Sequence, residues 1–327
     1  MLIEQRVRAL HRFWSLVRRL TDFREFIILL VILAAALGMH IASPFFLQVG
    51  NVHSILLSLS LESIVAIGMT VLLVAGGFDL SVGSNLALSG MITALVLARG
   101  VPVPAAIAAG LATGAGVGVV NGLIIARVGI NPFITTLGMM SVLRGLVLVI
   151  SGGQNISGLP HSFNVIGQGK LGGIQFPILV AIVLVAAGDL LLRKSRFFRQ
   201  NYYIGGNSRA ALLSGIPVAR VTVINYAITG ALAAVAGIIM TARLGAASVT
   251  AGNGLELRVI SAVIIGGASL QGGEGTVLGS FLGVLLMAII VNALTLFGVD
   301  VYWNSLVIGG TLLLAVLVDT LVKKRSL

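Results

Sequence analysis

The sequence predicts an all-α, polytopic membrane protein that crosses the bilayer about ten times. Charged residues make up only 9% of the 327 residues, against about 25% in an average soluble domain. Hydrophobic residues make up 57%, and the mean hydropathy is +1.10. No water-soluble globule of this length could bury so much apolar surface. The composition therefore excludes soluble enzymes, disordered chains and nucleic-acid binders.

Ten apolar segments justify the count of spans. In chain order they are 26–43, 55–75, 82–98, 103–126, 132–150, 177–192, 221–242, 258–270, 276–297 and 302–322. A straight span needs about 20 residues, and most segments qualify. The segment 258–270 has 13 residues, and 82–98 contains Gly83 and Gly90. These two segments predict short or broken helices near a solute path, and eight or nine spans remain open if some segments are re-entrant.

Residues 1–25 precede the first span and lack the apolar stretch and cleavage site of a signal peptide. The apolar residues that share one helical face there are Leu10, Phe13, Trp14, Val17 and Leu20. This stretch is predicted to be either an amphipathic helix in the membrane interface or a plain cytoplasmic leader. We expect residues 26–327 to form one transmembrane domain, with 193–220 as its longest inner loop.

Basic residues decide the orientation, because cytoplasmic loops carry an excess of Lys and Arg. An even number of spans puts both termini on one side, together with the loop 193–220. That side holds six basic residues in 1–25, Arg127, six in 193–220 and three in 323–325, whereas the other side holds four. We therefore expect both termini to be cytoplasmic. The net charge of +11 then suits the anionic face of a membrane rather than nucleic acid.

Motifs for covalent or metal chemistry are absent from the sequence. The chain has no cysteine and its four histidines are scattered, which excludes disulfides, thiol catalysis and Cys-based metal sites. The glycine-rich stretches 167–171 and 266–275 do not match a phosphate-binding P-loop. We expect no cofactor or metal in this chain and no ATP hydrolysis by it.

The inner loop 193–220 contains signals for a short helix over 208–214. Asn207 is a good N-cap, Gly215 is a good residue just after the C-terminus, and Pro217 follows. A two-turn helix is marginal in water, which indicates docking on a partner. Its small residues Ala210, Ala211 and Ser214 would fit a groove in that partner. The alternative is a simple connector lying on the membrane.

A second signal is the stretch 76–84 between the second and third spans. Gly76 and Gly77 let the backbone leave helical geometry, and Asp79 or Ser81 can cap a helix that begins at Val82. The stretch is either a broken helix at a gate or a well-capped inner turn.

Glu62 lies about eight residues into an otherwise apolar span, so it should face the bundle interior. It lines a path, pairs with Arg144 or is protonated; Arg144 can equally reach the membrane surface. The intramembrane amides Asn121, Asn225 and Asn292 serve as ties between helices or as ligand groups, and the former use is the more common.

Glu256 and Arg258 precede the short span on the outer side. Glu256 either caps that helix or meets an external binding protein.

Several motifs together resemble those of the permease subunits of ribose-type carbohydrate ABC importers, from about Phe45 to Asp319. The matching stretches are Ile67–Thr70, Gly76–Ser84, Thr135–Met139, Leu143–Gly145, Gly205–Asn207, Leu213–Ile216, Ala234–Ile239, Gly254–Leu257 and Ala262–Gly273. The chain departs from the family at Phe78, where an aliphatic residue is common. It departs also at Glu62, where a small or neutral polar residue is usual, and a path-facing acid there implies a change in substrate choice.

The resemblance implies a multi-subunit importer in the bacterial cytoplasmic (inner) membrane. Two permease chains, identical or related, form the pore. Separate ATPase subunits bind MgATP, and an external solute-binding protein delivers a monosaccharide or similar small solute. The residues expected to couple to the ATPase are Gly205, Gly206, Asn207, Arg209, Ala210, Ser214, Gly215 and Ile216. Those expected on the path or gate are Glu62, Asp79, Ser81, Asn121, Arg144 and Asn292, with Glu256 at the binding protein.

Two alternatives belong to other classes. In an ion-coupled secondary transporter, Glu62 and Asp79 would be the coupling acids, and transport would collapse with an ionophore. An integral membrane enzyme would need clustered catalytic or metal groups, and the absence of cysteine and of paired histidines argues against it.

Overall fold

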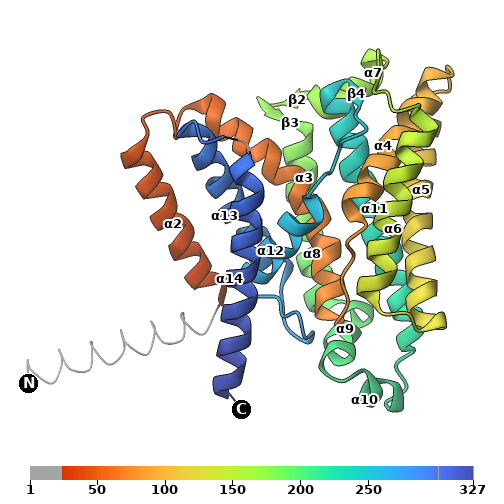
Figure 1. Cartoon of the computed structure of the whole chain (residues 1–327), viewed down its shortest axis with the longest axis vertical. Helices are drawn as coiled ribbons and strands as arrows, with labels where there is room; N and C mark the ends of the chain where they lie inside the picture. Colours follow the sequence, from red (N-terminus) through yellow and green to blue (C-terminus); the bar gives the residue numbers. More distant parts are fainter. Residues whose placement is uncertain (1–23, 301, 327) are drawn as a thin grey trace, which may run out of the picture.

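The computed structural model describes residues 24–300 and 302–326 and shows one helical bundle (Figure 1). The predicted all-helical membrane fold is confirmed, because the described residues include seven helices long and apolar enough to cross a membrane. These are α2 (Arg24–Ala42), α3 (Val49–Val74), α5 (Val103–Leu123) continued by the π-helical turn η1 (Ile124–Val128), α6 (Pro132–Ser151), α8 (Phe176–Lys194), α11 (Val218–Leu244) and α13 (Val277–Leu296).

Shorter elements complete the described chain. They are α4 (Val82–Ala98), α7 (His161–Gln168), α9 (Arg196–Gly206), α10 (Ser208–Leu213), α12 (Leu255–Ile265), α14 (Tyr302–Ser326), β1 (Ile156–Ser157), β2 (Lys170–Leu171), β3 (Ile174–Gln175) and β4 (Ala246–Ala247). Each of the ten predicted apolar segments thus overlaps a helix, although 258–270 extends beyond the end of α12. The predicted amphipathic stretch 1–25 lies almost entirely outside the described residues.

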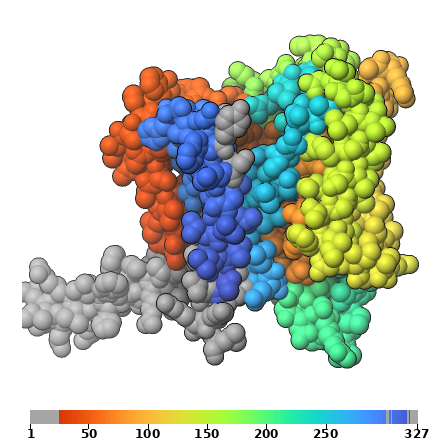
Figure 2. All heavy atoms as spheres, viewed as in Figure 1, coloured from red at the N-terminus to blue at the C-terminus, as the bar shows by residue number. Residues whose placement is uncertain are grey.

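The two ends of the bundle differ. The short antiparallel pairs β1–β4 and β2–β3 lie at one end together with α7 (Figure 1). The opposite end carries α9 and α10, and both the start of α2 and the C-terminal end of α14 lie towards it. In the space-filling view, α9 and α10 project below the body of the bundle (Figure 2). Because the first and the last described helix have their outer ends on the same side, the chain between them crosses the membrane an even number of times, as predicted.

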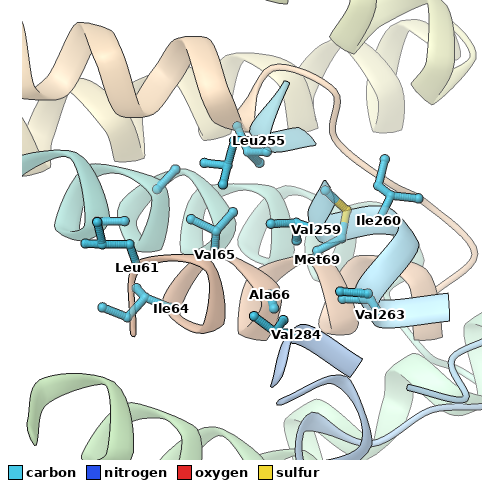
Figure 3. Packing of buried hydrophobic residues seen from close by; sticks show 14 of the residues in the cluster. Leu61, Ile64, Val65, Ala66, Met69, Leu255, Val259, Ile260, Val263 and Val284 are labelled. Atoms are coloured by element: carbon cyan, nitrogen blue, oxygen red, sulfur yellow. The ribbon is translucent and has the colours of Figure 1, made fainter. Parts of the chain in front are cut away.

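Helix α3 forms the centre of the core. In its most apolar 18-residue stretch, 83% of the residues are buried, the largest share among the seven long helices. Val65 and Met69 of α3 pack with Val259 and Val263 of α12 and with Val284 of α13 (Figure 3). In a bilayer such contacts hold helices together through close packing, since lipid tails are as apolar as the side chains.

Glycine explains how α5 lies against α11. Gly110, Gly114, Gly118 and Gly122 recur at every fourth position and are buried on one face of α5. A Cβ atom at Gly118 would collide with the α11 backbone at Tyr226. The two helices therefore touch through their backbones, as small residues permit in membranes.

Helix α12 is too short to cross the membrane alone. Its 11 residues extend about 16 Å, roughly half of a bilayer core. The predicted boundaries 258–270 are wrong at both ends, because the helix begins at Leu255 and stops at Ile265. Gly267 adopts φ +95°, which breaks the helix, and an irregular segment 266–276 then leads into α13.

Candidate solute path and coupling segment

Glu62 of α3 forms an ion pair with Arg258 of α12 inside the bundle. Arg258 Nε donates to Glu62 Oε1 at 2.8 Å, and the two side chains are 26% and 16% exposed, respectively. The alternative pairing with Arg144 is wrong. Arg144 instead donates from Nη1 to the backbone oxygens of Val249 and Ala251 at 3.0 and 2.9 Å. It therefore holds the segment between α11 and α12 against α6.

A cavity of about 370 Å³ opens beside this ion pair. It lies between α3, α12, α13 and α14, and its polar side chains are Ser54, Ser58, Glu62, Arg258, Asn292, Thr295 and Asn304. Ser54, Ser58 and Glu62 are spaced four residues apart, so they share one face of α3. The cavity is thus lined by hydroxyls, amides and one neutralised pair of charges, which suits a polar solute.

Asn292 lines the cavity and also ties two helices together. Its amide exchanges hydrogen bonds with Asn51 of α3, at 2.7 Å in one direction and 3.1 Å in the other. Asn225 makes a comparable tie, because its Nδ2 donates to Asn201 Oδ1 of α9 at 2.8 Å. Such ties are the common use of amides within membranes.

Asp79, Ser81 and Asn121 come together in a second cluster, away from the cavity. Asp79 Oδ1 accepts from the backbone N–H of Ser81 at 2.7 Å and from its hydroxyl at 2.6 Å. Asn121 Nδ2 of α5 donates to Ser81 Oγ at 3.0 Å. All three residues are at most 1% exposed. In this conformation the cluster fixes the segment between α3 and α4, and its place on a path or gate remains a prediction.

The predicted capping of α4 by Asp79 or Ser81 is wrong, because neither side chain accepts a hydrogen bond from an N–H within the helix. Ser81 occupies the N-cap position, but its side chain makes no capping bond to the helix. The carboxylate two residues earlier accepts the Ser81 N–H instead. A carboxylate at a helix N-terminus also interacts favourably with the helix dipole.

Glu256 lies in the first turn of α12, where an acid is favoured. Its carboxylate comes close to Gly83 of α4 and interacts electrostatically with Arg144 and Arg258. The side chain is only partly exposed, and a contact with a binding protein stays a prediction.

The short helix in the inner loop is confirmed, with its end shifted by one residue. The Asn207 side chain accepts from Ala210 N at 2.9 Å at the start of α10. Gly215 adopts φ +85° after the end, where the N–H of Ile216 donates to Ala211 O at 3.1 Å. These contacts fix the two ends of α10, as the residues at 207 and 215 predict.

The prediction that Ala211 faces a partner together with Ala210 and Ser214 is wrong. Ala211 is 5% exposed and packs inward on Ile204 and Val221. The small residues instead line a groove of about 470 Å³ beside α9. Leu213 is 84% exposed at the tip of the loop, and Arg209 is exposed as well. A partner would therefore meet apolar and basic side chains around a shallow groove.

Helix α9, which the sequence reading missed, connects this surface to the membrane core. Gly205 lies so close to Val74, after which α3 ends, and to Gly273 that a Cβ atom would collide with both backbones. The hydroxyl of Tyr202 donates to Gly275 O at 2.8 Å. Gly206 has nothing within 4 Å of a Cβ position. The end of α9 is thus fixed to the segment 266–276, which connects α12 to α13.

Comparison with known proteins places this geometry in a family. The family described as "Branched-chain amino acid transport system / permease component" matches residues 51–316. The chain belongs to this family of permease components. It is 40% identical to the ribose import permease protein RbsC of Bacillus subtilis, over 96% of this chain and 95% of that protein.

Other relatives give the same result. RbsC of Escherichia coli is 39% identical over 92% of this chain and 94% of its own length. The L-arabinose ABC transporter permease protein AraH of Azospirillum brasilense is 37% identical over 94% of this chain and 88% of its own. No solved structure matches the chain. A permease component is a transport subunit, so the chain is not itself an enzyme.

Several residues of the cavity were not predicted from the sequence, namely Ser54, Ser58, Arg258, Thr295 and Asn304. The spacing of Ser54, Ser58 and Glu62 was the available signal, because hydroxyls and an acid at four-residue intervals mark one polar face of a helix. The pairing of Arg258 with Glu62 has no local signal, since 196 positions separate them.

Proposed function

We propose that the chain is the permease subunit of an ABC importer that carries a monosaccharide, with MgATP hydrolysed by a separate subunit. One observation carries the proposal. Similarity to the ribose import permease RbsC extends over 96% of the chain. It therefore includes both the helices around the cavity and the loop that carries α10.

The orientation follows from charge. Cytoplasmic loops carry the excess of Lys and Arg, and α9 and α10 lie in the arginine-rich loop 193–220. We place this end of the bundle, with both termini, in the cytoplasm. The opposite end, with α7 and the short strands, then faces the external binding protein.

A second permease chain completes the path in this proposal. Ser54 and Ser58 are exposed on α3 although most of this helix is buried. Polar side chains at membrane depth face water or another protein rather than lipid. A second copy, or a related chain, would cover this face and leave the solute path between the two subunits.

Coupling to the ATPase is assigned to α10 and the groove beside it. ATP binding in the partner would move α10, and α9 would pass the movement to the segment 266–276 through the contact at Gly205. The two permease halves would then open alternately to the two sides of the membrane. No covalent step on the solute is needed, and weak binding favours release.

A branched-chain amino acid is the second candidate solute, because the family description names that class. The acid and base at the cavity would match the ammonium and carboxylate groups of a zwitterion. The pair is already closed at 2.8 Å, however, so a zwitterion would have to separate it. The named sugar permeases among the relatives also favour the monosaccharide.

Purification of the tagged chain with its neighbouring subunits tests the proposal. We expect a P-loop ATPase to co-purify, and proteoliposomes of the complex to import labelled D-ribose or L-arabinose only with ATP and a binding protein. A protonophore should leave uptake unchanged. Import by the chain alone, driven by an ion gradient, would refute the ABC assignment and return Glu62 and Asp79 to the role of coupling acids. Uptake of leucine rather than a sugar would favour the second candidate.

A further inference from the structure

We propose that the cavity between α3, α12, α13 and α14 binds one uncharged polyol, and that the Glu62–Arg258 pair excludes charged solutes from it. This inference rests on the proposed function and gives it a recognition site. It assigns a solute-binding role to Arg258, Ser54, Ser58 and Asn304.

The side chains that line the cavity match the chemistry of a sugar. Ser58 and Asn304 bring a hydroxyl and an amide that both donate and accept hydrogen bonds, as sugar hydroxyls do. Ile55, Ala288 and Ile308 add apolar surface to the same cavity. A monosaccharide presents hydroxyls around its rim and C–H groups on its faces, so the mixture of hydrogen-bonding groups and apolar walls suits it.

The ion pair uses only one of the two carboxylate oxygens of Glu62. Arg258 Nε is bonded to Oε1 of Glu62, and among the described residues no hydrogen bond reaches Oε2. This carboxylate oxygen belongs to a side chain that lines the cavity, so it can accept a hydrogen bond from a hydroxyl of the solute while the ion pair stays intact. The cavity then offers charge-assisted hydrogen bonds, which are stronger than neutral ones.

The same closed pair gives selectivity. The two charges cancel, so an anion or a cation entering the cavity gains no net attraction. Such a solute would lose its hydration, and a partly buried charge without a partner is strongly unfavourable. An uncharged polyol avoids this penalty and uses both members of the pair.

The size of the cavity and its opening also suit a single sugar. A volume of about 370 Å³ lies near the lower end of the usual range for small-molecule pockets, about 300–1,000 Å³, which suits a single sugar ring. Ser54 and Ser58 are exposed, so the cavity opens along the side of α3 that no other described helix of this chain covers. A solute can therefore reach the ion pair along a stripe of hydroxyls.

Cysteine labelling gives the first test, because the natural chain contains no cysteine. Ser58→Cys is introduced into the complete transporter, and its reaction with a small hydrophilic thiol reagent is followed with and without D-ribose, L-arabinose and the binding protein. We expect the transported sugar to slow labelling at least threefold. Ser162→Cys, exposed on α7 at the end of the bundle and outside the cavity, is the matched control, and the sugar should not change its labelling when the binding protein is present throughout.

Charge variants give the second test. Glu62→Gln leaves the cavity with one unpaired positive charge. We expect KM for the sugar to rise about tenfold, and the sugar acid D-ribonate to become a competitive inhibitor, which it is not for the natural protein. The exchange Glu62→Arg with Arg258→Glu restores neutrality and should abolish inhibition by D-ribonate. A purely structural pair would change the amount of folded protein without creating sensitivity to the anion.

The outcomes distinguish failure of the proposed function from failure of the recognition site. If the natural complex imports no sugar with ATP, the proposed function fails and the recognition site fails with it. If the natural complex imports sugar but Ser58→Cys is not protected, the cavity is not the binding site. Glu62→Gln with unchanged KM and no inhibition by D-ribonate would refute the role of the ion pair.

Discussion

Replacing Gly205 by alanine should disconnect α9 from the membrane core. A Cβ atom at position 205 would collide with the carbonyl oxygen of Val74 and with the amide nitrogen of Gly273. Both are backbone atoms, which cannot turn away as a flexible side chain would. Gly206→Ala is the matched control, since nothing lies within 4 Å of a Cβ atom there.

The magnitude follows from these contacts. Overpacking of a close contact costs about 1–3 kcal/mol. The shift would also strain the hydrogen bond from Gly273 N to Val74 O, now 2.8 Å long, whose net value is about 1 kcal/mol. We therefore expect Gly205→Ala to lower the free energy of unfolding by about 2–4 kcal/mol in total. Gly206→Ala should be neutral or slightly stabilising, because alanine suits a helix better than glycine.

The assay combines stability and function. Both variants are purified with the ATPase, unfolding is measured in detergent, and ATP-driven sugar uptake is measured in proteoliposomes. We expect Gly205→Ala to retain ATPase binding through α10 while losing most uptake, because the contact between α9 and the core is broken. Equal stability and equal uptake for the two variants would refute the importance of this contact.

Three further predictions follow from individual contacts. Asn207→Leu removes the cap of α10, worth about 1 kcal/mol, and should reduce uptake and ATPase co-purification, whereas Asn207→Asp keeps an acceptor and should retain both; normal uptake by the leucine variant would count against docking. Gly118→Ala should destabilise the protein by about 1–3 kcal/mol through collision with the α11 backbone, while Gly116→Ala, in open space, should have no effect on thermal unfolding. Tyr202→Phe removes the 2.8 Å bond to Gly275 O and should lower stability by about 1 kcal/mol in the same assay, a loss that an unchanged melting curve would contradict.

The fold was largely predictable from hydropathy, because a chain in lipid must form helices from its apolar segments. The start of α3 was predicted six residues late, because Asn51, His53 and Ser54 lower the hydropathy of its first turns. The end of α12 was predicted too late for the opposite reason. Ala268 and Leu270 continue the apolar pattern beyond the glycines that stop the helix.

The site was predictable only in part. Local rules found the caps of α10, because Asn207 and Gly215 act through their own neighbourhood. They did not find α9, whose aromatic residues are mixed with arginines and amides in a polar loop. The ion pair between Glu62 and Arg258 depends on how distant helices pack, and the sequence does not determine that geometry by spacing.

The contact at the end of α9 joins three stretches of backbone with no side chain between them. Gly205, Gly272 and Gly76 approach one another directly. A side chain at such a contact would absorb a small displacement by changing rotamer, and these glycines have none to change. Any movement of α9 must therefore be followed by both neighbouring segments or must break the contact. The amide of Gly273, bonded to Val74 O, thereby becomes a built-in reporter: its exchange with deuterium should accelerate in each ATPase state that opens the contact.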